Sequence, residues 1–108
     1  MSWTLDDASA LYGIDRWGSG YFAVNEAGHV CVRPSGADGP AVDLHDVVEG
    51  LRARDLSAPL VIRFSGIIAA SMRRLAEAFE SAMAENSYRG SYRAVFPIKV
   101  NRHRQVVE

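Results

Sequence analysis

The chain has 108 residues, of which 48% are hydrophobic and 23% are charged, and its formal net charge is −1. This composition is typical of one small soluble domain and excludes an intrinsically disordered chain. The balanced charge gives no reason to expect a nucleic-acid or membrane partner. Cys31 is the only cysteine, so no intrachain disulfide can form and a reducing, cytoplasmic location is expected. The acidic start has no signal-peptide pattern, and no apolar run is long enough to span a membrane.

The first part of the chain predicts a β-hairpin after a weakly helical lead-in at residues 1–11. The segments "YFAV" (21–24) and "HVCVR" (29–33) flank the four-residue loop "NEAG", in which Asn25 and Gly28 suit a tight turn. The Pro- and Gly-rich stretch "PSGADGP" (34–40) then predicts an irregular loop. We therefore assign residues 1–42 to an N-terminal extension that carries the hairpin.

A short helix is predicted next, at about 44–54, with Asp43 as its N-cap. Its apolar residues recur with the spacing of one helical face. They are Leu44, Val47, Val48 and Leu51.

Residues 60–100 have the pattern of a βαβ unit. The apolar segment "LVIRF" (60–64) predicts a strand, residues 66–85 predict a long amphipathic helix capped by Ser65, and residues 92–100 predict a second strand. Two such strands are expected to be parallel, with a right-handed crossover. Because parallel sheets normally have several strands and both faces covered, we expect residues 43–108 to begin a larger α/β domain.

Lys99 is the only lysine of the chain. The chain also has eleven arginines. It lies near the carboxyl end of the second predicted strand, where the binding sites of parallel α/β sheets gather. Unlike arginine, lysine can lose its proton and act as a nucleophile or form a Schiff base. The alternative is a strand-end lysine whose ammonium group reaches solvent, and the residues alone favour this second interpretation.

The other candidate residues indicate less specific roles. Pro97 removes one hydrogen-bond donor from the predicted strand, and the charged "RHR" (102–104) is more typical of a solvated face than of a phosphate site. The three histidines do not have the spacing of metal ligands, so no metal site is assigned. Cys31, on the hairpin, is expected to be a buried apolar residue.

The stretch "VFPIKVN" around Lys99 resembles the "Y-P-I-K-V-N" segment of the biosynthetic arginine decarboxylases. Three longer stretches, "YGIDRWGSGYFAVNEAGHVCVRP" (12–34), residues 43–68 and residues 88–108, look like successive segments of the same family. The chain departs from the family pattern at a few positions near these segments. They are Phe96 for tyrosine, Gly66 for aspartate, and Arg102 and His103 for a glutamine pair.

The resemblance implies an α/β fold in which an N-terminal β-hairpin precedes the first, incomplete βαβ unit of a pyridoxal 5′-phosphate (PLP)-binding (β/α)8 barrel. It implies a lyase that decarboxylates L-arginine to agmatine and CO2 in polyamine (putrescine and spermidine) biosynthesis. Lys99 would be the catalytic residue and would bind PLP. The family also implies Mg2+, for which no ligand is assigned, and a homo-oligomeric intact enzyme.

Several alternatives stay open. The chain could belong to another basic amino-acid decarboxylase or to a racemase of the same barrel group, or it could be a non-catalytic interaction module. It is expected to be either a piece of a longer sequence or a truncated gene product. In both cases the 108 residues alone are expected to be inactive.

Overall fold

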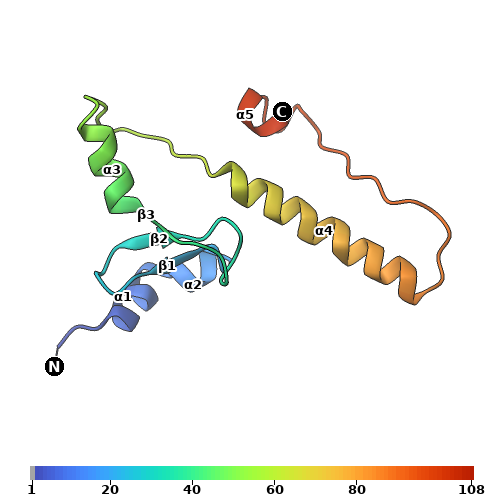
Figure 1. The fold of residues 1–108 in the computed structure, drawn as a ribbon, viewed down its shortest axis with the longest axis horizontal. Helices are drawn as coiled ribbons and strands as arrows, with labels where there is room; N and C mark the ends of the chain where they lie inside the picture. The colour runs from blue at the N-terminus through green and yellow to red at the C-terminus, as the bar shows by residue number, and fades with distance from the viewer. Residues whose placement is uncertain (1) are drawn as a thin grey trace. The chain divides into compact units, whose positions relative to one another are not determined.

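The computed structural model describes residues 2–108 and divides the chain into two compact units, the first ending at Arg63 and the second running from Phe64 to Glu108 (Figure 1). The elements of the first unit are α1 (Leu5–Tyr12), α2 (Ile14–Trp17), β1 (Phe22–Val24), β2 (Val30–Val32), β3 (Val42–Asp43) and α3 (Leu44–Arg52). The second unit holds α4 (Ser65–Glu85) and α5 (Arg104–Val107).

The sheet of the first unit is antiparallel and has the strand order β1-β2-β3. Ala23 of β1 pairs with Cys31 of β2, and the two strands are joined by a turn in which the Gly28 N–H donates to the Asn25 carbonyl oxygen at 2.9 Å. Gly28 has φ of +81°, a backbone conformation that residues with a Cβ rarely adopt. The predicted hairpin and its four-residue turn are confirmed.

The lead-in helix α1 begins with a capping box. The Thr4 side chain accepts from the Asp7 N–H at 3.1 Å, and the Asp7 carboxylate accepts from the Thr4 N–H at 2.9 Å. The helix ends at Tyr12, and its C-cap Gly13, with φ of +63°, turns the chain into α2. The helical lead-in is therefore confirmed, whereas α2 was not predicted, because four residues are too few to show a helical period.

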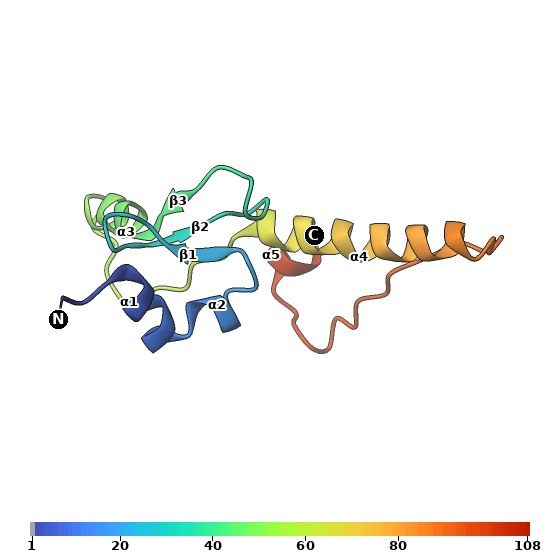
Figure 2. The same ribbon diagram turned by 90° about the horizontal axis from the view of Figure 1, so that it is seen from below.

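The core of the first unit is small and consists of four buried apolar side chains: Ile14, Tyr21, Cys31 and Val32. Cys31 and Val32 are neighbours on β2, so their side chains lie on opposite faces of the sheet. Figure 2 shows α1 and α2 together on one side of the sheet, in agreement with their contacts to β1. The buried position of Cys31 confirms its predicted apolar role.

Helix α3 follows directly from β3 and packs on the strands. Asp43 is its N-cap and accepts from the His45 N–H at 2.8 Å, as predicted. Because β3 and α3 contact the hairpin, the compact unit extends past residue 42, to Arg63. The predicted boundary between the N-terminal extension (1–42) and the start of the larger α/β domain (43–108) stays a prediction.

The long helix predicted at 66–85 is confirmed as α4, but its predicted cap is wrong. Ser65 is already the first helical residue, and the N-cap is Phe64, with the extended backbone angles φ −105° and ψ 91°. An N-cap residue must lie outside the helical region, so Ser65 cannot hold this position. Near the end of the chain, Arg104–Val107 forms the short helix α5.

The strands predicted at 60–64 and 92–100 are not formed in the structure. Residues 60–64 and 91–97 lie outside helices and strands, and residues 98–100 form a turn. A strand requires a neighbour that supplies hydrogen bonds to its backbone, and within residues 2–108 the strands pair only in the antiparallel sheet of the first unit. The observed fold is therefore a small α/β arrangement without a parallel βαβ unit among the described residues.

Candidate functional site

Lys99 lies in the turn at 98–100, on the segment that joins α4 to α5 (Figure 1). The turn is closed by the Val100 N–H, which donates to the Pro97 carbonyl oxygen at 3.0 Å. The structure thus places Lys99 at a turn rather than within a paired strand.

The surroundings of Lys99 are apolar and open to solvent. Side chains on both sides of it are exposed, with exposed fractions of 56% for Ile98 and 72% for Val100, and Phe96 is 51% exposed. Lys99 itself is exposed, and no ion pair joins its amine to any residue in the range 2–108. A primary amine is the group that forms a Schiff base with an aldehyde, and in this chain the amine of Lys99 is accessible to solvent.

The charged residues after Lys99 form local interactions. The Arg104 Nε donates to the Glu108 carboxylate at 2.6 Å across α5, and the His103 N–H donates to the Asn101 side-chain oxygen at 3.0 Å. Both side chains of the ion pair are mostly exposed. These contacts agree with the predicted solvated face at 102–104.

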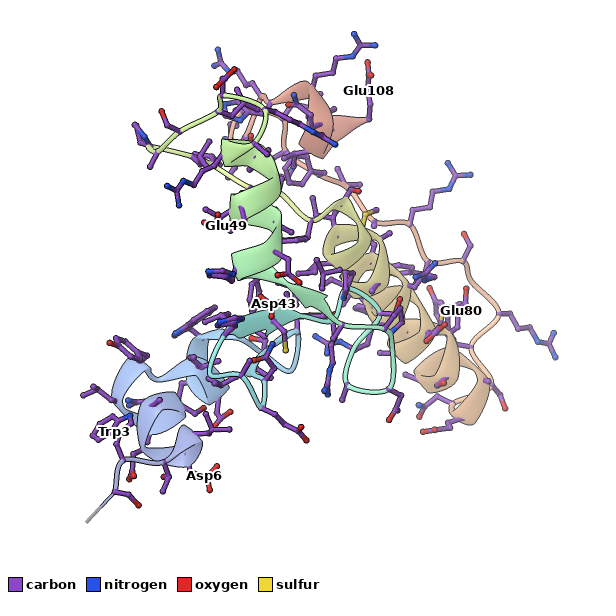
Figure 3. All side chains as sticks on the ribbon, turned by 60° about the vertical axis from the view of Figure 1, so that its left-hand side comes forward. Trp3, Asp6, Asp43, Glu49, Glu80 and Glu108 are labelled. Carbon is purple, nitrogen blue, oxygen red and sulfur yellow. The ribbon has the colours of Figure 1, made fainter. Side chains whose placement is uncertain are left out.

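A second cluster, which we name the Asp43 junction, consists of Asn25, His29, Asp43 and His45. The Asp43 carboxylate accepts from Asn25 Nδ2 at 2.8 Å, lies 2.9 Å from His29 Nδ1, and caps α3 through the His45 N–H. Figure 3 shows Asp43 where the sheet meets α3. No sequence pattern links these residues, because 14 positions separate His29 from Asp43.

The hydrogen bonds of the junction lower the pKa of Asp43 from its usual 3.8 to about 2. The largest cause is the hydrogen bond from His29, and those from Asn25 and the His45 N–H act in the same direction, whereas desolvation opposes them. The Asp43 carboxylate is therefore ionised throughout the neutral range.

Neither candidate region offers a metal site. Among residues 2–108, no three His, Cys, Asp or Glu side chains are placed to share a metal ion. The rings of His29 and His45 are stacked, with 4.5 Å between their centroids and 17° between their planes. No helix of the described residues is long and apolar enough to cross a membrane.

Comparison with known proteins relates the chain to a segment of much larger proteins. No protein-family model matches it. Curated relatives nevertheless match almost its whole length, and the chain spans about one sixth of the length of these relatives.

These relatives are named biosynthetic arginine decarboxylases. The protein of Parasynechococcus marenigrum is 49% identical over 106 residues, which are 98% of this chain and 16% of the relative. The protein of Synechococcus sp. is 50% identical over 108 residues, which are 100% of this chain and 17% of the relative. The protein of Xanthomonas campestris is 51% identical over 104 residues, which are 96% of this chain and 16% of the relative. The chain is therefore homologous, along nearly all its length, to part of the biosynthetic arginine decarboxylases, which confirms the resemblance stated from its residues.

Proposed function

We propose that the chain is the N-terminal part of a PLP-dependent arginine decarboxylase, which converts L-arginine into agmatine and CO2 for polyamine biosynthesis. The observation that carries this proposal is the identity of 49–51% over 96–100% of the chain to relatives with that printed name. Because the chain spans about one sixth of their length, the activity belongs to the whole protein and the 108 residues alone are inactive.

Lys99 is the residue of this chain to which we assign the covalent attachment of PLP. Its amine is exposed and unpaired among residues 2–108, so it is available to the cofactor's aldehyde. When bound, PLP supplies an electron sink for the charge that remains after the carboxylate leaves the substrate. Lys99 would hold the cofactor in place before the reaction and recapture it when the product leaves.

The apolar segment around Lys99 determines how the amine would behave in the whole protein. Phe96, Ile98 and Val100 are more than half exposed in this chain. If the remainder of the protein covers them, water is excluded near Lys99 and the apolar segment holds its amine in position for the cofactor.

The remainder of the protein would also complete the barrel. Residues 60–64 and 91–97 flank α4 in the order of a βαβ unit but lack strand partners within residues 2–108. The side chains of Met72, Leu75 and Phe79, which share one face of α4, are 48–61% exposed. We propose that further strands pair with both flanking segments and cover this face, which gives the parallel, helix-covered sheet of a (β/α)8 barrel.

The remaining features of the proposed enzyme follow from the family. It would be a cytoplasmic homo-oligomer that requires Mg2+, and no residue of this chain is assigned as a ligand of that ion.

The direct test is the activity of the full-length protein with a substitution at Lys99. The Lys99→Arg variant keeps a positive charge and a long side chain but cannot form the Schiff base, so formation of agmatine is expected to fall by at least about 1,000-fold. The matched control is Arg93→Lys, which makes the reciprocal change at an exposed position six residues earlier and should keep wild-type activity.

Product analysis separates the alternatives. Formation of agmatine and CO2 from L-arginine supports the decarboxylase, whereas D-arginine would identify a racemase. Wild-type turnover by Lys99→Arg would contradict the role of Lys99, and the absence of any reaction with L-arginine would contradict the proposed function.

A further inference from the structure

The segment that carries Lys99 is held at a few points on either side of the lysine. Most side chains of residues 91–108 are exposed, and the three that are half-buried are Tyr92, Asn101 and Val106. Tyr92 precedes Lys99 in the chain, whereas Asn101 and Val106 follow it. Lys99 is therefore an exposed residue between contacts that fix its neighbours.

The outer contacts attach both ends of this segment to α4. Tyr92 stacks on Phe79 of α4, with 4.4 Å between the ring centroids and 13° between the ring planes. Helix α5, which contains Val106, also contacts α4. Figure 2 shows the chain after α4 returning towards the start of that helix, where α5 lies. The path of the segment past Lys99 is thus defined at its two ends by one helix.

The inner contact is made by Asn101, two residues after the lysine. Its side-chain Oδ1 accepts from the His103 N–H at 3.0 Å, which is the bond of an Asx turn. The turn that contains Lys99, closed by the Val100 N–H, ends directly before Asn101. Helix α5 begins directly after His103. Consecutive turns therefore run from residue 97 into α5 and restrict the backbone on the carboxyl side of Lys99.

The Asn101 bond differs from the neighbouring bonds because its acceptor is a side chain. The turn at 97–100 is closed by a backbone bond, and the first turn of α5 is closed by the Val106 and Val107 N–H groups on the His103 carbonyl oxygen. Side-chain substitutions leave those backbone donors and acceptors in place. A substitution at Asn101 removes its acceptor and leaves the amine of Lys99 unchanged.

We propose that Asn101 is a positioning residue for Lys99. Its bond to the His103 N–H fixes the backbone that presents the lysine amine to PLP. This role rests on the proposed function, in which Lys99 binds PLP, and adds a second residue to that site. A segment without the bond has more freedom, which it must lose when the cofactor binds, so its affinity for PLP is lower.

The test is a titration of the PLP-free full-length protein with PLP. The visible absorbance of the Schiff base measures the affinity, and borohydride followed by mass spectrometry measures the PLP fixed to Lys99. Asn101→Ala should weaken PLP binding about three- to tenfold, which is the contribution expected of one hydrogen bond. Asn101→Asp and the uncharged Asn101→Ser keep an oxygen acceptor, so both should bind PLP more tightly than Asn101→Ala.

The matched control is Asn86→Ala, in the same unit but outside the segment of Lys99. It also removes a side-chain hydrogen bond, from Asn86 Nδ2 to the Ala82 carbonyl oxygen at 2.8 Å, at the end of α4. A general loss of stability would affect both alanine variants. A positioning role predicts wild-type PLP affinity for Asn86→Ala and reduced affinity for Asn101→Ala.

The outcomes separate this role from the proposed function. If PLP labels Lys99 in the wild type and Asn101→Ala binds PLP as tightly, the role of Asn101 is wrong and the proposed function stands. An equal loss of affinity in Asn101→Ala and Asn86→Ala, or in all three Asn101 variants, would also overturn the positioning role. A wild-type protein in which PLP does not label Lys99 would contradict the proposed function and the role of Asn101 with it.

Discussion

The two units of the chain differ in what holds them together. The first unit has a hydrophobic core of four buried side chains, a paired sheet and two helices with side-chain N-caps. The second unit has a 21-residue helix but no buried side chain anywhere in residues 64–108. Since helices in proteins are stabilised mainly by packing of an apolar face, the second unit by itself is less stable than the first, and the further strands proposed above would stabilise it by covering its apolar face.

The largest expected effect of this difference is on backbone hydrogen exchange. In the 108-residue chain, amides of α4 should exchange at least about tenfold faster than those of β2, relative to unstructured peptide, because an unpacked helix opens readily. In the full-length protein, α4 should become strongly protected. Mass spectrometry of peptides from both proteins measures this, and equal protection of α4 in the two would contradict the dependence of the second unit on further protein.

The next largest difference is expected when an apolar side chain is shortened to alanine in each unit. Ile14 is 2% exposed, so Ile14→Ala is expected to lower the free energy of unfolding of the first unit by about 2–5 kcal/mol. Leu75→Ala, at a 51% exposed position of α4, should change the stability of the 108-residue chain by less than about 1 kcal/mol. Urea unfolding followed by far-ultraviolet circular dichroism, which reports on the helices of both units, measures both, and a larger effect of Leu75→Ala would reverse the comparison.

Two glycine substitutions should have opposite signs within the first unit. Gly28→Ala forces a Cβ onto a residue with φ of +81° and should cost about 1–2 kcal/mol, although the added Cβ would meet Leu5 Cδ2 only at 3.9 Å. Gly50→Ala, within α3 and with no atom within 4 Å of its added Cβ, should instead stabilise by about 0.5–1 kcal/mol. Thermal unfolding of both variants checks this, and a stabilising Gly28→Ala would show that the hairpin turn has another conformation.

The smallest effect concerns acid stability. The pKa of Asp43 is about 2 in the folded chain and near its usual 3.8 when unfolded. The stability that this carboxylate contributes is therefore present above about pH 4 and is lost as the pH falls towards 2. Asp43→Asn should reduce the pH dependence of unfolding in this window, as measured by urea unfolding at several pH values. An unchanged pH dependence would show that the Asp43 hydrogen bonds do not form.

Sequence patterns predicted the elements whose stabilising contacts are local. The hairpin turn depends on Asn25 and Gly28, the start of α3 on Asp43, and the long helix on its apolar period, and all three are confirmed. The two predicted strands are not formed, because a strand's hydrogen bonds come from another segment and none of the described residues supplies them. The same reasoning explains why β3 was missed, since only its pairing with β2 defines it as a strand.

Of the two candidate sites, the one that depends on a local sequence feature could be predicted and the one that depends on tertiary contacts could not. Lys99 could be singled out from the sequence, because a lone lysine in an apolar stretch is a local feature. The Asp43 junction could not, because the fold brings His29 of the hairpin to Asp43 and His45 at the start of α3. The sequence did predict a hairpin turn at Asn25 and an N-cap at Asp43. Nothing in it indicated that these two residues would be in contact.

The central claim is that Lys99 anchors PLP, and reductive trapping tests it most directly. Borohydride treatment of the full-length protein with PLP should fix the cofactor to the peptide that contains Lys99, the one lysine among these 108 residues. The label should be absent from Lys99→Arg and should not appear at position 93 in Arg93→Lys. Cofactor fixed to a lysine beyond residue 108, with Lys99 unmodified, would contradict the account.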